Sequence, residues 1–317
     1  MAGSVTAMIR AVGRIFVTRE LPFPALERLA AEHDLDVWEG DLPPDAAAMR
    51  EHAAQADALL TLVTDPVDAQ LLDAAPGLRA IANMAVGTDN IDLEAASARG
   101  IPVGNTPDVL TDATADLAFA LLLALARRIP EGAAQVREGR WRTWEPAAGL
   151  GADLAGSTLG IVGRGRIGDA VARRAAGFGL DVLHTSRSSG LPLGELLERS
   201  DFVSLHTPLT PDTRHLIDRD ALSRMKPTAL LVNTSRGGVV DQSALREALM
   251  EGRIAGAALD VTVPEPLPPD DPLLDAPNLL VVPHVGSATV RTRARMAEMA
   301  VENLLAALAG RPMPYAV

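Results

Sequence analysis

The stretch that decides the fold runs from Leu159 to Gly168 and reads Leu-Gly-Ile-Val-Gly-Arg-Gly-Arg-Ile-Gly. Its first four residues are apolar or small, and they predict a buried strand. Glycines follow at once, and apolar residues at helical spacing from Ile167 to Ala175 predict a helix behind them. A glycine turn between a strand and a helix can bind a dinucleotide pyrophosphate at the helix N-terminus.

The three glycines of this turn serve different purposes. Gly163 allows the tight turn, Gly165 lets a pyrophosphate approach the backbone, and Gly168 lets the helix pack close to the strand. The alternative is a glycine-rich turn without a ligand, but the flanking strand and helix favour binding. We therefore expect cofactor contacts along the whole turn, with at least one arginine facing the phosphates: Gly163, Arg164, Gly165, Arg166, Ile167 and Gly168.

Short apolar segments alternate with helical ones along the whole chain. Strands are predicted at 15–17, 35–38, 58–62, 80–82 and 102–103, and again at 159–162, 182–185, 202–205, 229–232, 257–259 and 279–282. This alternation predicts an α/β chain with two doubly wound parallel sheets, each covered by helices on both faces. A helix predicted over 290–308 would pack back on the first domain. We expect one discontinuous domain, residues 1–108 and 289–317, and a second domain, residues 109–288.

Composition limits the classes of partner. The chain of 317 residues carries 29 basic and 41 acidic side chains, a formal charge of −12, so it should repel nucleic acid. It has no cysteine, which excludes disulfides and thiolate metal sites and fits a reducing cytoplasm. The longest apolar run, Leu117 to Ala126, is too short to cross a membrane. Residues 1–13 show no periodicity, and we expect a loose leader there.

The residues after the next predicted strand bear on the choice of cofactor. An NAD-selective site carries an Asp or Glu there, which accepts hydrogen bonds from the ribose hydroxyls. This chain has Ser186, Arg187 and Ser188 instead. No carboxylate would repel a 2′-phosphate, and an arginine can pair with it. The sequence therefore predicts NADPH in preference to NADH, with NAD use still possible. The alternative for Arg187 is an exposed loop residue without a ligand.

Three charged or titratable residues follow three successive strands of the second series. Arg236 follows strand 229–232, Glu265 follows strand 257–259, and His284 follows strand 279–282. The carboxyl ends of parallel strands share one rim of a sheet, where ligands bind in open α/β folds. Each residue alone would most simply be structural. The three together, after a cofactor turn, favour catalysis.

These three side chains suit the reduction of a 2-keto acid. The planar fork of Arg236 matches a carboxylate, and the imidazole of His284 can donate a proton near neutral pH. A carboxylate such as Glu265, hydrogen-bonded to an imidazolium, favours its protonated form. His206 also ends a strand beside Thr207 and Pro208, where lining the cofactor site and simple packing are equally open roles.

At these motifs the sequence resembles the D-isomer-specific 2-hydroxyacid dehydrogenases, and most of all their glyoxylate/hydroxypyruvate reductase branch. The resemblance covers nearly the whole chain. Its most specific segments are 86–92, 105–110, 163–168, 233–237, 260–266 and 283–289. It implies a Rossmann cofactor domain inserted in a flavodoxin-like substrate domain. The family's Arg–Glu–His catalytic set falls on Arg236, Glu265 and His284.

The resemblance also implies binding residues and a partner. Substrate contacts are expected at Ala85, Val86 and Gly87 through backbone N–H groups, and at Arg236 and His284. Cofactor contacts are expected at Thr111, His206, Thr207, Pro208, Thr213, Asn233, Thr234, Ser235, Asp260 and Gly286. Family members are usually homodimers built through the cofactor domain. Trp144 lies in a segment that resembles one projecting toward the partner's active site, so it is either a substrate-shaping residue or a buried interface aromatic.

The expected reaction is the reduction of glyoxylate or hydroxypyruvate to the D-2-hydroxy acid, with hydride from the nicotinamide and the proton from His284. A D-lactate-like 2-keto acid reductase is the alternative enzyme. A formate dehydrogenase is a weaker one, because its chemistry needs no proton donor to an alkoxide. From another class, a catalytically silent dinucleotide-sensing protein is the alternative. Such a protein should carry peptide-docking grooves or tails, of which the sequence gives no sign.

Overall fold

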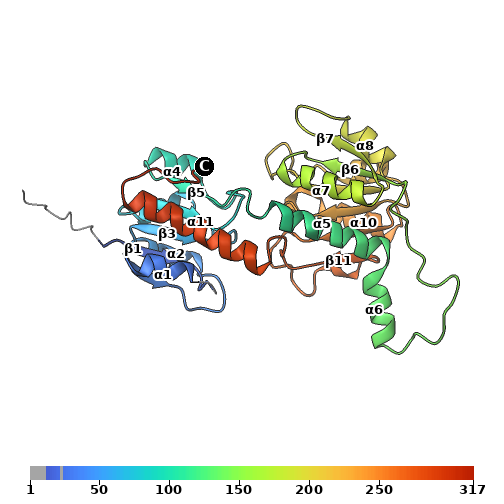
Figure 1. Ribbon diagram of the computed structural model, residues 1–317, viewed down its shortest axis with the longest axis horizontal. Coiled ribbons are helices and arrows are strands. Elements are labelled where there is room, and N and C mark those ends of the chain that lie inside the picture. The colour runs from blue at the N-terminus through green and yellow to red at the C-terminus, as the bar shows by residue number, and fades with distance from the viewer. Residues whose placement is uncertain (1–11, 22–23) are drawn as a thin grey trace, which may run out of the picture. The chain divides into compact units, whose positions relative to one another are not determined.

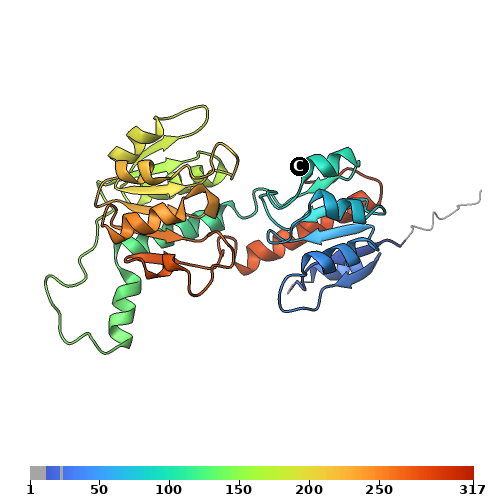
Figure 2. The same ribbon diagram turned by 180° about the vertical axis from the view of Figure 1, so that it is seen from behind.

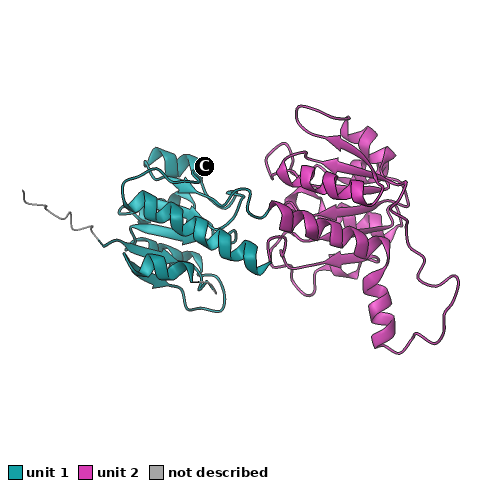
Figure 3. Ribbon diagram, viewed as in Figure 1, with its two compact units in different colours: residues 1–110, 289–317 teal, residues 111–288 magenta. Residues whose placement is uncertain are grey.

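The computed structural model describes residues 12–21 and 24–317. The chain divides into two compact units, shown in Figure 3. Unit 1 comprises residues 1–110, as far as they are described, and Thr289–Val317; unit 2 comprises Thr111–Ala288. The chain crosses between the units after Leu110 and again after Ala288. Most of the leader expected over residues 1–13 lies outside the described residues.

Unit 1 is built on a five-stranded parallel sheet in the order β2-β1-β3-β4-β5. Its strands are β1 (Arg14–Val17), β2 (Asp34–Val37), β3 (Ala58–Thr61), β4 (Ala80–Asn83) and β5 (Val103–Gly104). This is the strand order of flavodoxin-like folds. The helices are α1 (Ala25–Ala30), α2 (Ala46–Ala53), α3 (Ala69–Ala74), α4 (Leu93–Ala98) and α11 (Val290–Leu308).

Both faces of this sheet are covered, so the central strands β3 and β4 are buried along their whole length, whereas the edge strand β2 alternates polar and apolar residues. Ile15 and Val17 of β1 pack on the side of α1 and α11, whereas Phe16 between them packs against α2, α3 and α4. Figure 1 shows α11 crossing the near face of the sheet, and Figure 2 shows the opposite face. The C-terminal helix therefore belongs to the core of unit 1.

Unit 2 carries a six-stranded parallel sheet in the order β11-β10-β9-β8-β6-β7. Its strands are β6 (Thr158–Val162), β7 (Asp181–Thr185), β8 (Phe202–Leu205), β9 (Leu230–Asn233), β10 (Gly256–Leu259) and β11 (Leu279–Val281). On one face lie α5 (Thr111–Ala126) and α7 (Arg166–Gly177). On the other lie α8 (Leu193–Arg199), α9 (Arg219–Arg224) and α10 (Gln242–Met250). Each predicted strand is present, with both ends within one residue of the expected ones.

The strand order of unit 2 fixes where a ligand can bind. The first strand, β6, has the second strand on one side and the third on the other, so the chain changes direction between β6 and β8. Open parallel sheets bind ligands at such a switch point, beyond the carboxyl ends of the strands. The glycine turn after β6 and the His206 segment after β8 meet there. A Cβ added to Gly163 would lie 2.6 Å from the His206 carbonyl oxygen.

One part of unit 2 stands apart from its sheet. Helix α6 (Ile129–Arg137) buries none of its residues, and Figure 1 shows it projecting from the unit ahead of a long loop. Several large apolar side chains of this arm, residues 129–150, are exposed: Ile129, Val136, Trp141, Trp144 and Leu150. Across the described residues, no helix is long and apolar enough to span a bilayer.

Candidate active site

Two glycines of the turn are required by the fold alone. Gly163 has φ +93°, a region that favours glycine. A Cβ on Gly168 would overlap the Gly163 carbonyl oxygen, because α7 starts hard against the turn. These two residues would be glycine in the absence of any ligand.

Gly165 is different, because the protein itself does not require it. An added Cβ would meet no atom within 4 Å, and its φ of −90° suits any residue. Gly165 caps α7 without a side-chain hydrogen bond, so the first N–H groups of this helix have no side-chain cap. Space and donors together fit an anion at the helix N-terminus.

Orphaned polar atoms line the neighbouring strand ends. His206 Nδ1, Thr207 Oγ1 and Thr234 Oγ1 are buried and have no hydrogen-bond partner among the described residues. Buried polar atoms are nearly always paired, so three such atoms on one rim indicate a polar ligand. Burial lowers the pKa of His206 to about 4, and His206 Nε2 lies 2.8 Å from Ser204 Oγ. His206 is therefore neutral, and it fits the wall of a cofactor site. The rim as a whole suits a nicotinamide dinucleotide.

The variable residues of the turn have protein partners. Arg164 Nε donates to Asp169 Oδ1 at 2.9 Å, and its Nη1 lies 2.9 Å from His184 Nδ1. No sequence pattern connects His184 with the turn; strand pairing of β7 beside β6 brings it there. Arg166 opens α7 with an exposed side chain.

At the ribose position, a tight turn follows β7. Ser186 Oγ donates to the Ser189 carbonyl at 3.0 Å and accepts from the Ser189 N–H at 3.1 Å. The guanidinium of Arg187 forms an ion pair with Asp212 at 3.2 Å, and these side chains are 84 % and 80 % exposed. Such an exposed ion pair contributes little to stability, so Arg187 can readily exchange Asp212 for another anion.

Asn233 fixes the backbone that carries Arg236. It is fully buried at the end of β9, and its Oδ1 accepts from the N–H and the hydroxyl of Ser235 at 3.0 and 2.8 Å. Its Nδ2 donates to the Arg236 carbonyl at 2.9 Å. Gly237 then packs on the Thr262 backbone so closely that a Cβ would overlap it. The segments that carry Arg236 and Glu265 are thereby joined.

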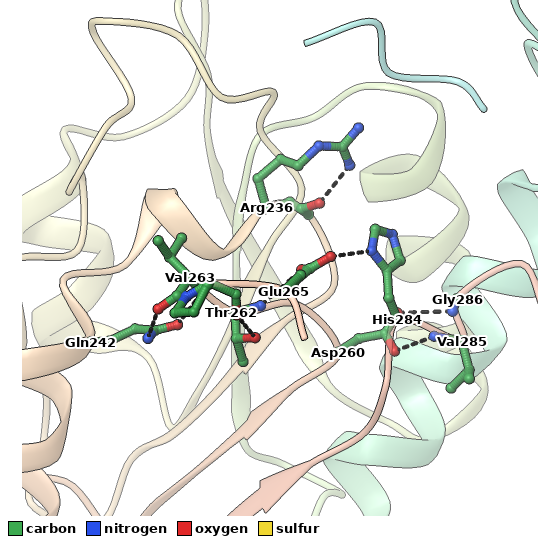
Figure 4. Close-up of polar contacts among 11 residues, drawn as sticks. Arg236, Gln242, Asp260, Thr262, Val263, Glu265, His284, Val285 and Gly286 are labelled. Atoms are coloured by element: carbon green, nitrogen blue, oxygen red, sulfur yellow. Dashed lines mark hydrogen bonds and ion pairs between the residues drawn. The ribbon is translucent and has the colours of Figure 1, made fainter. Parts of the chain in front are cut away.

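Glu265 and His284 form the centre of the site. The Glu265 Oε2 atom lies 2.8 Å from His284 Nδ1, and its Oε1 accepts from the Thr262 N–H at 2.9 Å. With Nδ1 engaged, Nε2 is the imidazole nitrogen left for a substrate. Figure 4 shows Arg236 and His284 extending to the same side of the strand ends, with Glu265 between them. Sequence reasoning predicted these three residues, and the fold brings them together.

The environment of Glu265 keeps it ionised. Burial alone would raise its pKa. The hydrogen bond and charge of His284, the Thr262 N–H and the charge of Arg236 together lower the pKa below its ordinary value. Glu265 is therefore a carboxylate at neutral pH, able to stabilise a positive charge on His284.

Asp260 holds the turn that carries His284. Its Oδ1 accepts from the Val285 N–H at 2.6 Å, its Oδ2 from the Gly286 N–H at 2.8 Å, and its carbonyl from the His284 N–H at 2.9 Å. His284 has φ +51°, uncommon for a residue with a side chain. The pKa of Asp260 is raised because burial outweighs these hydrogen bonds. Both of its carboxylate oxygens thus accept protein N–H groups.

The expected carboxylate loop lies in unit 1, directly after β4. Asn105 Nδ2 donates to the Val86 carbonyl at 2.8 Å, and Asn83 Nδ2 donates to the Gly87 carbonyl at 2.9 Å. Because C=O and N–H point in opposite directions across a trans peptide, the Asn105 bond fixes where the Gly87 N–H points. Sequence reasoning missed both asparagines. A polar residue at the end of an otherwise apolar strand was the signal for Asn83.

Three expected contacts receive less support from the geometry. The hydroxyl of Thr213 donates to the Pro208 carbonyl at 2.6 Å and accepts from the Thr210 N–H at 2.8 Å, so it is used within its own loop. Thr111 is the first residue of α5, and Trp144 is 80 % exposed on the arm.

Comparison with known proteins shows the family of this chain. The model for the NAD binding domain of D-isomer specific 2-hydroxyacid dehydrogenases matches residues 119–286. A glyoxylate reductase of Korarchaeum cryptofilum is 53 % identical over 316 residues, which cover 96 % of this chain and 95 % of that protein. The chain belongs to the D-isomer specific 2-hydroxyacid dehydrogenase family. The family predicted from the motifs is confirmed, with its glyoxylate reductase branch.

Solved structures of related proteins have the same fold as this dehydrogenase. A Thermus thermophilus protein superposes with a TM-score of 0.92 at 52 % identity, covering 96 % of this chain and 99 % of that one. An NADPH-dependent glyoxylate/hydroxypyruvate reductase of Sinorhizobium meliloti, solved with NADP and malonate, gives 0.84 at 36 % identity and 96 % of both chains. The chain is an oxidoreductase that uses a nicotinamide dinucleotide.

Proposed function

We propose that this dehydrogenase reduces glyoxylate or hydroxypyruvate to the D-2-hydroxy acid, with NADPH as the preferred cofactor. The observation that carries the proposal is the 2.8 Å contact between Glu265 and His284 on the rim that also bears the glycine turn. Arg236 on the same rim supplies the cation that a keto acid needs. The glyoxylate reductases among its relatives support this choice of substrate.

The side chains divide the chemistry among them. When bound, the nicotinamide supplies the hydride. Arg236 binds the substrate carboxylate and polarises the keto group through its planar fork. His284 donates its Nε2 proton to the keto oxygen as the carbon accepts hydride, so the carbonyl becomes a hydroxyl. Glu265 holds Nδ1 and stabilises the imidazolium before the transfer.

The two units have separate roles in this proposal. Unit 2 binds the cofactor through the turn of residues 163–168 and carries the catalytic set. Unit 1 supplies the carboxylate loop of Ala85, Val86 and Gly87, whose peptide planes Asn83 and Asn105 hold in place.

The preference for NADPH rests on the ribose position. Ser186 stands where an NAD-selective site carries an Asp or Glu. The exposed Arg187–Asp212 ion pair can be replaced by an ion pair between Arg187 and a 2′-phosphate at little cost in free energy. Arg187→Ser should therefore lower kcat/KM with NADPH by about tenfold, the loss of one charge-assisted pair, and leave NADH kinetics unchanged. Arg199→Ser, which removes another exposed arginine, is the matched control. A higher wild-type kcat/KM with NADH would overturn the preference.

A panel of glyoxylate, hydroxypyruvate and pyruvate with both reduced cofactors tests the reaction. Oxidation of cofactor should be fastest with the first two acids. His284→Ala should lower kcat by about 10²- to 10⁴-fold while NADPH still binds. Pyruvate as the best substrate would favour the D-lactate-like reductase. Cofactor binding without turnover of any acid would favour the dinucleotide-sensing protein, and wild-type turnover in His284→Ala would refute the proton donor.

A homodimer is proposed from the arm of residues 129–150. Several of its large apolar side chains are exposed, Trp144 to 80 %, and a second copy of the chain would cover them. Sedimentation of the purified chain should give twice the monomer mass, and a monomer at micromolar concentration would contradict this assembly.

A further inference from the structure

Gln242, the first residue of α10, uses its whole side-chain amide on one residue of the loop that carries Glu265. Its Nε2 donates to the Val263 carbonyl at 2.7 Å, and its Oε1 accepts from the Val263 N–H at 2.7 Å. Figure 4 shows this pair beside Glu265. Two opposed hydrogen bonds to a single residue fix both its position and the direction of its peptide groups.

The Thr262 backbone packs against Gly237, but the next residue, Val263, has no such contact through its side chain. The Val263 side chain is 51 % exposed, so packing does not anchor the residue. Val263 stands between Thr262, whose N–H donates to Glu265 Oε1, and Pro264, whose carbonyl accepts from Thr262 Oγ1 at 2.8 Å. A shift of Val263 would therefore move the groups that aim the Glu265 carboxylate.

We call the two hydrogen bonds from Gln242 to Val263 the Gln242 clamp. The helix α10 that carries Gln242 is held firmly. Asp241 caps α10 by accepting from the Ala244 N–H at 3.0 Å. Ala244, Leu245, Ala248 and Leu249 bury the helix against the sheet. Gln242 thus ties the partly exposed loop at Val263 to α10, a helix packed in the core of unit 2.

We propose that Gln242 is a positioning residue for Glu265, acting through the Val263 backbone to keep the carboxylate in contact with His284. This role rests on the proposed function, since it matters only if the Glu265–His284 pair delivers the proton. The hydrogen bonds of the Gln242 amide go to Val263, so Gln242 acts on the Glu265–His284 pair only through the Val263 backbone.

The test compares Gln242→Leu, which keeps the bulk and loses both hydrogen bonds, with Gln242→Glu, which keeps the acceptor for the Val263 N–H. Arg246→Met is the matched control, because Arg246 lies one turn later on α10 and its Nε donates to the Pro272 carbonyl at 2.8 Å. For each variant, kcat/KM for glyoxylate is measured against pH. NADPH affinity and amide hydrogen exchange over residues 260–266 are measured as well.

Gln242→Leu should lower kcat/KM by about 10- to 100-fold, as displaced catalytic groups do. The basic limb of its pH profile should move to lower pH, because the imidazolium loses part of its attraction to the carboxylate. Gln242→Glu should fall between Gln242→Leu and the wild type. NADPH affinity should stay within about twofold, since the cofactor turn is elsewhere on the rim, and Arg246→Met should match the wild type in each measurement.

Hydrogen exchange separates this inference from the proposed function, because it needs no turnover. Faster exchange over residues 260–266 in Gln242→Leu would support the clamp even if the wild type reduced no keto acid. That second result would refute the proposed reaction. Unchanged exchange in Gln242→Leu would overturn the clamp. An unshifted pH profile in an active Gln242→Leu enzyme would overturn the positioning role.

Discussion

Replacing Glu265 by glutamine tests the proposed proton donor most directly. Both Glu265 oxygens accept hydrogen bonds, one from the Thr262 N–H and one from His284. Glutamine has the same shape but offers one oxygen and one NH₂ group, and the NH₂ group cannot accept from the Thr262 N–H or from a protonated His284. The substitution therefore removes a negative charge and one acceptor together.

The magnitude follows from the geometry of the pair. Unit charges 2.8 Å apart attract by about 1.5 to 6 kcal/mol for effective dielectric constants of 80 to 20. The His284 and Glu265 side chains are 32 % and 29 % exposed, so water screens the pair and the low end applies. A loss of about 1.5 kcal/mol corresponds to about a tenfold change in rate.

The assay is kcat/KM for glyoxylate with NADPH, measured across the pH range. Glu265→Gln should lower kcat/KM by about tenfold on the basic side of the profile, with a smaller loss at more acidic pH. Glu251→Gln removes a surface carboxylate paired with Arg253 and should leave the profile unchanged. A Glu265→Gln profile that superimposes on the wild type, or a loss equal at every pH, would refute the electrostatic role.

Three further predictions concern the turn, the fold and the arm. Gly165→Ala should weaken NADPH binding at unchanged melting temperature, because its Cβ meets only open space, whereas Gly168→Ala should lower the melting temperature; equal stability losses in the two variants would contradict this. Burial alone would raise the pKa of Asp201, but hydrogen bonds from Lys226 and a backbone N–H lower it. Its stabilisation is thus present above the ordinary value of 3.8 and is lost as pH falls through the lower folded value. Asp201→Asn should therefore flatten the acid dependence of the free energy of unfolding in urea titrations, and an unchanged slope would count against it. Trp144→Ala should change kcat/KM ratios among keto acids while costing less than about 0.5 kcal/mol of stability, and unchanged ratios would remove Trp144 from the substrate site.

The sequence alone determined the elements of this protein and the chemistry available at their ends. Most of these parallel strands are short apolar segments, and each predicted strand lies within one residue of its observed bounds. Helix α11 has the bounds that its periodicity predicts, Val290–Leu308. The glycines of the turn follow from local backbone demands, and Arg236, Glu265 and His284 follow from their places after strands.

Tertiary structure decided which of these ends meet. Side-chain patterns show that a strand is buried but not which strand lies beside it, so the placing of β6 between β7 and β8 could not be read from them. That order brings the His206 backbone against Gly163. The bonds from Gln242 to Val263, and from Asn105 to Val86, join residues about 20 positions apart. Their partners are set by the packing of whole elements, and no local pattern records them.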